Sequence, residues 1–145
     1  MVWLKVIYFG VFVREKAGSD DGENGQPVGT VQTNWETRVD DQESVAVAVT
    51  PLLIDLSSRA TEWKFDVSMN THSVELNQDM MKSAVLFDDQ GNEYPVLKWE
   101  GSEPGGHHRE GILIFDPVKP SPLSITLLLK SIGGVPERSF TWNLK

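Results

Sequence analysis

From Ser44 onward the chain alternates apolar and polar residues with a period of two, which is the pattern of β-strands that bury one face. In the first such run, Val45, Val47 and Val49 share one face. The same pattern returns in six later runs separated by turn-forming residues, at 63–69, 83–88, 94–99, 110–115, 123–130 and 140–144. Alternation of this kind predicts that most of the chain folds as strands.

Turn signals predict how neighbouring strands connect. Asp89-Gln90-Gly91-Asn92 predicts a turn, and we expect Tyr94 to Trp99 to pair back on the preceding run as a hairpin. Gly133-Gly134-Val135-Pro136 predicts the turn between the last two runs. A single helical turn around 76–82 is the helical signal in this part of the chain. The sequence therefore predicts an antiparallel arrangement.

Seven short strands in about 100 residues are typical of an all-β fold, an antiparallel β-sandwich of immunoglobulin-like architecture. The Cys…Trp…Cys signature of antibody domains is absent because the chain has no cysteine. A small open β-barrel is the alternative. Trp63, Trp99 and Trp142 lie in strand patterns, and we expect them in the core.

The first 43 residues differ from this pattern and suggest two further segments. Residues 1–13 are apolar except for Lys5, which is too short a run to span a bilayer. This segment is interpreted as the remnant of a membrane anchor or export signal, with a β-strand and an interfacial segment as alternatives. Residues 14–43 are rich in glycine and acids, and predict a flexible linker in which 27–39 could lie as an edge strand anchored by Trp35. The folded domain is then expected at 44–145.

Charge and composition exclude several classes of function. The net charge of -8 opposes binding to nucleic-acid phosphate, and no basic patch compensates for it. The absence of cysteine excludes disulfide scaffolds, thiol catalysis and thiolate zinc sites. The 145 residues are enough to bury a core without metal or disulfide support.

Three segments carry a resemblance to other proteins. They are Phe65-x-Val67-x-Met69-Asn70-Thr71-His72-Ser73, Leu86-x-Asp88-x-x-Gly91-x-x-Tyr94-x-Val96-x-x-Trp99, and Gly105-Gly106-His107-His108-Arg109-x-Gly111-x-Leu113-x-Phe115. This part of the chain resembles a group of uncharacterised bacterial proteins with an N-terminal signal or anchor, a polar linker and one β-rich domain. The resemblance implies an extracytoplasmic, membrane-anchored location. It assigns no activity to the chain. The N-terminus here is shorter and less signal-like than in that group.

The three histidines lie in two turn-like segments, each next to a strand pattern, and loops of a sandwich gather at its two ends. If both segments share an end, His72 with His107 or His108, plus Asp79 or Glu110, would supply nitrogen and oxygen ligands suited to zinc or copper. In an extended segment, however, neighbouring His107 and His108 would point to opposite faces.

A second interpretation of the same residues is that they hold the loops in place. Thr71 and Ser73 can form local side-chain turns, and Gly105-Gly106 can adopt positive φ. Arg109 would then pair with an acid such as Glu75 or Asp79. We expect this loop-bracing role rather than a metal site.

Catalytic signatures are lacking in the sequence. Ser73 beside His72 is not a triad, and no nucleophile elbow, P-loop, dinucleotide fingerprint or zinc-protease motif is present. The run Asp88-x-Gln90-x-Asn92 lacks the closing glutamate of a calcium loop. We therefore expect a non-enzymatic, extracytoplasmic module that requires no cofactor and binds an unknown protein or small ligand through its loops, with membrane attachment through the N-terminus. The alternative is an envelope metal-binding protein that uses copper or zinc.

Overall fold

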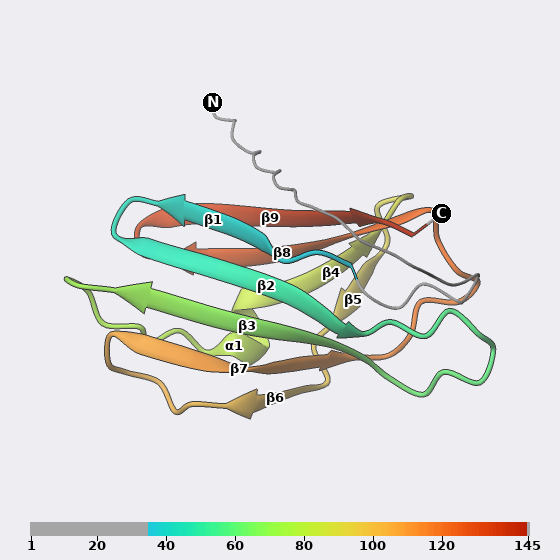
Figure 1. The fold of residues 1–145 in the computed structure, drawn as a ribbon, viewed down its shortest axis with the longest axis horizontal. Coiled ribbons are helices and arrows are strands. Elements are labelled where there is room, and N and C mark those ends of the chain that lie inside the picture. The colour runs from blue at the N-terminus through green and yellow to red at the C-terminus, as the bar shows by residue number, and fades with distance from the viewer. Residues whose placement is uncertain (1–34, 145) are drawn as a thin grey trace, which may run out of the picture. The chain divides into compact units, whose positions relative to one another are not determined.

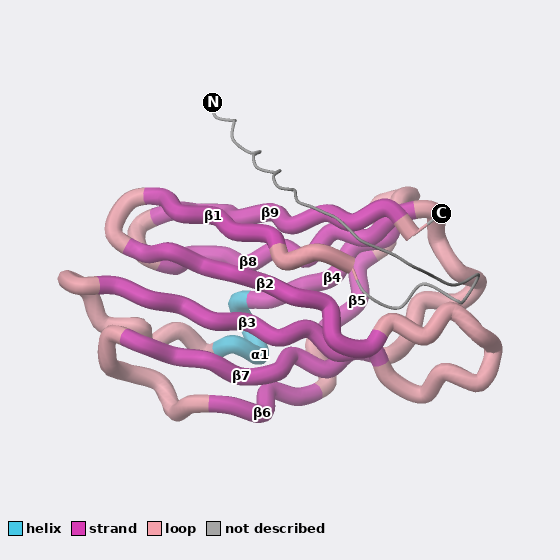
Figure 2. Tube along the Cα trace, viewed as in Figure 1, coloured by secondary structure: helices cyan, strands magenta, loops and turns pink. Residues whose placement is uncertain are grey.

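The computed structural model describes residues 35–144, and their strands form two antiparallel sheets (Figure 1). The first sheet contains β1 (Arg38–Gln42), β2 (Val45–Leu53), β3 (Trp63–Thr71), β7 (His108–Phe115) and β6 (Lys98–Gly101), in that order. The second contains β5 (Glu93–Pro95), β4 (Ala84–Asp88), β8 (Ser124–Ile132) and β9 (Val135–Asn143). The helix α1 (Met80–Ser83) is one short turn before β4, at the end of the predicted 76–82 segment (Figure 2).

The strand order confirms the predicted immunoglobulin-like sandwich. The series β2-β3-β7-β6 corresponds to strands A, B, E and D of that fold, and β5-β4-β8-β9 corresponds to C′, C, F and G. The sheets pack face to face and do not close into the alternative barrel. Nine strands occur in 35–144 rather than seven, because β1 is an additional edge strand and the predicted run 94–99 divides into two.

The alternating apolar residues form the core, as predicted. Every second residue is buried throughout β3 and in β2 as far as Pro51, and the large aromatic residues of both sheets meet between them. Phe65 contacts the ring of Phe115 edge-on at 5.7 Å and that of Trp142 at 5.8 Å. Trp63 and Trp142 are at most 1% exposed. Burial of each such side chain contributes about 1.5–3 kcal/mol to stability.

The chain crosses from one sheet to the other between β5 and β6. Tyr94 pairs with Leu86 of β4, which confirms the predicted hairpin at its start. Pro95 has no N–H to continue the pairing, and the next residue, Val96, turns into the core. Leu97 then donates its N–H to the carbonyl of Ile114 in β7, 2.8 Å away. The prediction of one continuous hairpin strand from Tyr94 to Trp99 is therefore wrong in its second half.

Part of the predicted linker is structured. Residues 1–34, which include the whole apolar segment 1–13, lie outside the described residues, as does most of the linker. Its last part forms β1, which pairs with β2 from Arg38↔Val49 to Gln42↔Val45, and Trp35 is half-buried against the core. The sheet thus begins before Ser44. Across 35–144, no helix has the length and apolar character needed to cross a membrane.

Arg138 joins β1 to the other sheet from a fully buried position in β9. Its Nη1 donates to the carbonyls of Asp40 and Val45 at 3.1 and 3.0 Å, and its Nη2 to those of Gln42 and Ile132 at 3.2 and 2.9 Å. Burial lowers the pKa of Arg138, and the charge of Asp40 acts in the opposite direction. Four backbone carbonyls therefore accept all the hydrogen bonds of the Arg138 guanidinium.

Candidate functional site

The loops lie at two ends of the sandwich (Figure 1). One end, the histidine end, carries segments 72–79 and 102–107, which connect to β3 and β7. The other, the pocket end, carries segments 54–62, 89–92 and 116–123. The metal-ligand candidates of the sequence all lie at or near the histidine end.

The two histidine-bearing segments do meet, as the loop argument predicted. Thr71 N donates to the His107 carbonyl at 3.0 Å, and Leu76 N donates to the Gly106 carbonyl at 2.9 Å. Gly105 N donates back to the Leu76 carbonyl at 2.8 Å. Gly105 and Gly106 both have positive φ, which confirms the predicted turn. Backbone hydrogen bonds therefore join the two segments.

His108 and Glu110 are the two predicted ligands that the structure brings into contact. They lie two residues apart on the outer face of β7, and the Nε2 of His108 is 2.9 Å from Oε2 of Glu110. The Nδ1 of the same ring faces Oδ1 of Asn70 on the paired strand β3. Both ring nitrogens are thus engaged with side-chain oxygens, and both His108 and Glu110 are more than half exposed.

The other three candidates are exposed and do not join this pair. His72 and His107 lie in the connecting loops, and Asp79 is the N-cap of α1, where its Oδ1 accepts from Met81 N at 3.0 Å. Within 35–144, no group of three or more His, Cys, Asp or Glu side chains is arranged to hold a metal ion. The loop is braced by the Thr71 hydroxyl, which accepts from Ser73 N and Val74 N at 3.2 and 3.4 Å.

The buried side chain of Arg109 joins the two loop segments of the histidine end. It is 1% exposed, and its guanidinium donates to the carbonyls of Leu76, Gln78 and Ser102 at 2.8–3.2 Å. The same group stacks on the ring of Trp99, 5.6 Å from the centroid. Burial lowers the pKa of Arg109, while the charges of Asp79 and Glu103 raise it. The predicted ion pair with an acid is replaced by hydrogen bonds to backbone carbonyls.

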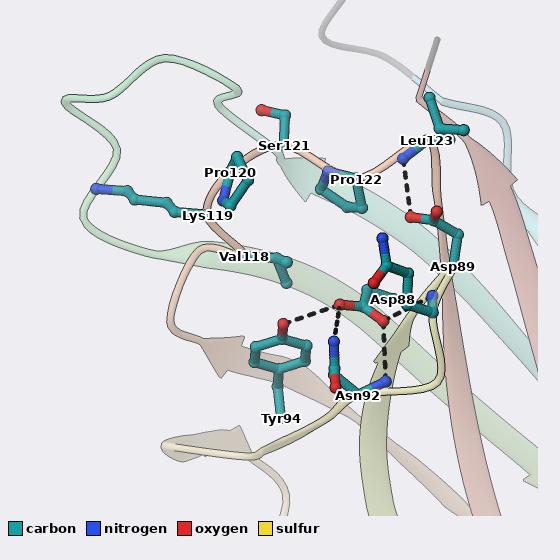
Figure 3. Close-up of a pocket in the computed structure, with 11 residues that line it drawn as sticks. Asp88, Asp89, Asn92, Tyr94, Val118, Lys119, Pro120, Ser121, Pro122 and Leu123 are labelled. Carbon is teal, nitrogen blue, oxygen red and sulfur yellow. Dashed lines mark hydrogen bonds between the residues drawn. The ribbon is translucent and has the colours of Figure 1, made fainter.

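The pocket end contains a solvent-open cavity of about 360 Å³ that the sequence did not reveal (Figure 3). It lies between the β4–β5 turn and the segment that leads into β8. The lining residues are Asp88, Asp89, Gln90, Asn92, Tyr94, Val118, Lys119, Pro120, Ser121, Pro122 and Leu123. Its volume falls within the range of small-molecule sites, about 300–1,000 Å³.

Four hydrogen bonds hold the Asp88 carboxylate in place in this cavity. Its Oδ1 accepts from Gln90 N and Asn92 N, both at 2.9 Å, and its Oδ2 accepts from Asn92 Nδ2 at 2.9 Å and Tyr94 Oη at 3.0 Å (Figure 3). These hydrogen bonds, that of the Asn92 amide first, lower the pKa of Asp88 to about 2. Burial and the hydrogen bond to Asp88 raise the pKa of Tyr94. The turn is thus the predicted hairpin turn, and the structure adds that the Asp88 carboxylate anchors it.

The opposite wall of the cavity is formed by the segment before β8. Asp89 ties the two walls together, because its Oδ1 accepts from Leu123 N at 3.0 Å. Pro120, Pro122 and Val118 present apolar surface to the cavity. The ammonium of Lys119 points away from Asp88 and donates to the Ser58 carbonyl at 3.1 Å (Figure 3).

The cavity could not be predicted from the sequence, because its two walls are about 30 residues apart in the chain and neither wall is a motif. The one local signal was the polar run Asp88-Asp89-Gln90, which a turn explains equally well. Comparison with known proteins adds nothing to this geometry: no protein-family model, no curated protein and no solved structure matches the chain.

Proposed function

We propose that the chain is a non-enzymatic binding module, and that it binds its ligand in the cavity at the pocket end. The single observation that carries this proposal is the cavity itself, built on two walls that Asp89 joins through its hydrogen bond to Leu123 N. Loops on a rigid sandwich are a frequent place for recognition. We propose an extracytoplasmic location for the module, on the basis of the resemblance described above.

The geometry of the cavity favours binding over catalysis. The Asp88 carboxylate already accepts four hydrogen bonds, so its proton-accepting capacity is spent within the protein. The lining residues include no histidine or cysteine. The Lys119 ammonium donates to the Ser58 carbonyl and the Ser121 hydroxyl to the Leu56 carbonyl, so neither is held as an activated nucleophile beside a base. What the lining offers is a fixed charge, polar side chains and an apolar wall, a combination typical of a recognition site.

The test is a fragment screen followed by amide NMR of the full chain. We expect binding fragments to shift the amide resonances of 88–94 and 118–123, while those of 102–110 stay in place. Asp89→Leu, which removes the link to Leu123 N, should weaken every such fragment. Thr126→Ala, in the second sheet outside the cavity, is the matched control. Fragments that shift only residues outside these two segments would contradict the proposal.

Metal binding by His108 and Glu110 is the second candidate, because these two side chains are the predicted ligands that contact each other, at 2.9 Å. It differs from the first candidate in its place, at the histidine end, and in its ligand, copper or zinc. A separate titration distinguishes it, as described in the Discussion.

A further inference from the structure

We infer that the ligand of the cavity is an organic cation: an ammonium or guanidinium group on an aliphatic stem. This inference rests on the proposed binding function and goes beyond it by naming the class of ligand. Three features of the cavity lead to it: the balance of hydrogen-bonding groups, the apolar wall and the direction of Lys119.

Three residues of the cavity keep acceptors that no hydrogen bond among the described residues uses up. Asp89 uses only Oδ1, in accepting from Leu123 N, so Oδ2 is free among the described residues. Tyr94 donates its hydroxyl proton to Asp88, which leaves the lone pairs of Oη for an incoming donor. Asn92 uses its Nδ2 toward Asp88, which leaves Oδ1. These acceptors, together with the charges of Asp88 and Asp89, match ammonium and guanidinium groups, which donate hydrogen bonds and have no acceptor.

The far wall suits the stem of such a ligand. Pro120 offers exposed apolar surface opposite the polar turn, and the largely buried Val118 and Pro122 lie beside it (Figure 3). An aliphatic chain of four or so carbons that lies on this wall would contribute about 0.8 kcal/mol for each CH₂ that it buries. The ring of Tyr94 lies on the polar side, where a cation can approach its face.

No cationic side chain among the described lining residues occupies the place that the ligand's cation would take in the cavity. Among the described residues that line the cavity, Lys119 is the one cation, and its ammonium is directed to the Ser58 carbonyl outside the turn. Asp88 stays charged through its hydrogen bonds, and Asp89 adds a second negative charge. The net charge of -8 also favours the approach of a cation at moderate ionic strength.

The experiment compares four probes by NMR titration of the full chain at low salt. Nα-acetyl-lysine methylamide and Nα-acetyl-arginine methylamide represent a side chain of a partner protein, and pentylammonium represents a free alkylamine. Nα-acetyl-norleucine methylamide is the neutral match to the lysine probe. We expect at least one cationic probe to bind at least tenfold tighter than the norleucine probe and to shift Gly91 and Asn92. Tighter binding of the amino-acid probes than of pentylammonium would identify the ligand as a side chain of a partner protein rather than a free alkylamine.

Two charge variants localise the effect. Asp89→Asn keeps the Oδ1 acceptor for Leu123 N and removes one charge, and we expect it to weaken the cationic probe at least threefold. Glu137→Gln removes one charge from an exposed position of β9 outside the cavity, and should leave the affinity unchanged. Equal weakening by both variants, or failure of every cationic probe to bind tenfold tighter than the norleucine probe, would overturn the inference.

The outcome also separates this inference from the proposed function. If neutral fragments shift 88–94 and 118–123 while no cationic probe does, the binding function stands and the cation class is wrong. If neither neutral fragments nor cationic probes shift these segments, the binding function itself is wrong.

Discussion

Arg138 Nη1 lies 3.9 Å from the Asp40 carboxylate, yet all the hydrogen bonds of this guanidinium go to backbone carbonyls. Two of those carbonyls belong to β1, one to β2 and one to the end of β8. A single side chain therefore satisfies acceptors on both sheets at the edge where they meet. Arg138 is thus a structural residue whose hydrogen bonds all go to carbonyls, with the Asp40 carboxylate as a longer ion-pair partner.

Replacement of this residue should be costly. We expect Arg138→Met to lower the free energy of unfolding by roughly 3–5 kcal/mol, because buried carbonyls lose their donor. Urea denaturation followed by circular dichroism measures the change. Lys130→Met, at an exposed position of the neighbouring strand β8, is the control and should change stability by less than about 0.5 kcal/mol. Equal effects of the two variants would mean that the carbonyl bonds contribute nothing.

The two buried tryptophans are the second test. Trp63→Ala and Trp142→Ala should each destabilise the protein by roughly 3–5 kcal/mol, the usual cost of removing a large aromatic from a core. Both side chains are at most 1% exposed. Trp142 also donates Nε1 to the Glu36 carbonyl at 2.7 Å, so Trp142→Phe separates the loss of this bond from the loss of volume. Unchanged denaturation midpoints would contradict the assignment of the core.

The third prediction concerns acid stability. The pKa of Asp88 is about 2 in the folded chain, below its ordinary value of 3.8, so ionised Asp88 favours the folded state. This contribution is fully present above the ordinary value and is lost as pH falls from about 5 through 2. The melting temperature of Asp88→Asn should therefore lie below that of the wild type at pH 6 and approach it near pH 2.

A matched variant gives that comparison its control. Glu137→Gln removes one charge from an exposed residue whose side chain makes no hydrogen bond or ion pair with the described residues. Its melting temperature should follow that of the wild type across the same pH range. A gap between wild type and Asp88→Asn that stays constant down to pH 2 would argue against a carboxylate anchor.

The fourth prediction addresses metal binding at the histidine end. Both ring nitrogens of His108 face side-chain oxygens, so a metal ion would have to displace Asn70 or Glu110. We expect no one-to-one binding of zinc or copper by titration calorimetry at neutral pH. Tight stoichiometric binding that disappears in His108→Ala, with the fold intact, would reverse the order of the two proposed functions.

Periodicity predicted the strands well but not their partners. The alternation of Val45, Val47 and Val49 reports which face is buried, and the structure buries it. The same signal cannot say which sheet a strand joins, so it predicts one hairpin strand from Tyr94 to Trp99, whereas Lys98–Gly101 pairs with β7. β1 was missed as a core-domain strand because Asp40, Asp41 and Gln42 resemble a linker, and the donor to its carbonyls, Arg138, lies almost 100 residues away.

The candidate site shows the same division between local and distant signals. The meeting of the two histidine segments followed from sandwich geometry, whereas the side-chain contacts there depend on exact positions that no pattern reports. A signal for the two structural arginines was present. Arg138 lies an even number of residues from Phe140 and Trp142 in β9, and Arg109 an even number from Leu113 and Phe115 in β7. Strand alternation therefore places both arginines on the buried face.

β1 also has a consequence for solubility. It covers the edge of β2, whose sequence Val-Ala-Val-Ala-Val-Thr-Pro-Leu-Leu is uncharged and largely β-branched or aliphatic. An uncovered edge of that composition is a template for pairing with other chains, and charged edge strands are a common protection against it. Arg38, Asp40 and Asp41 supply such charges. Proteolytic removal of β1 would therefore expose this edge and make the domain prone to strand-mediated aggregation.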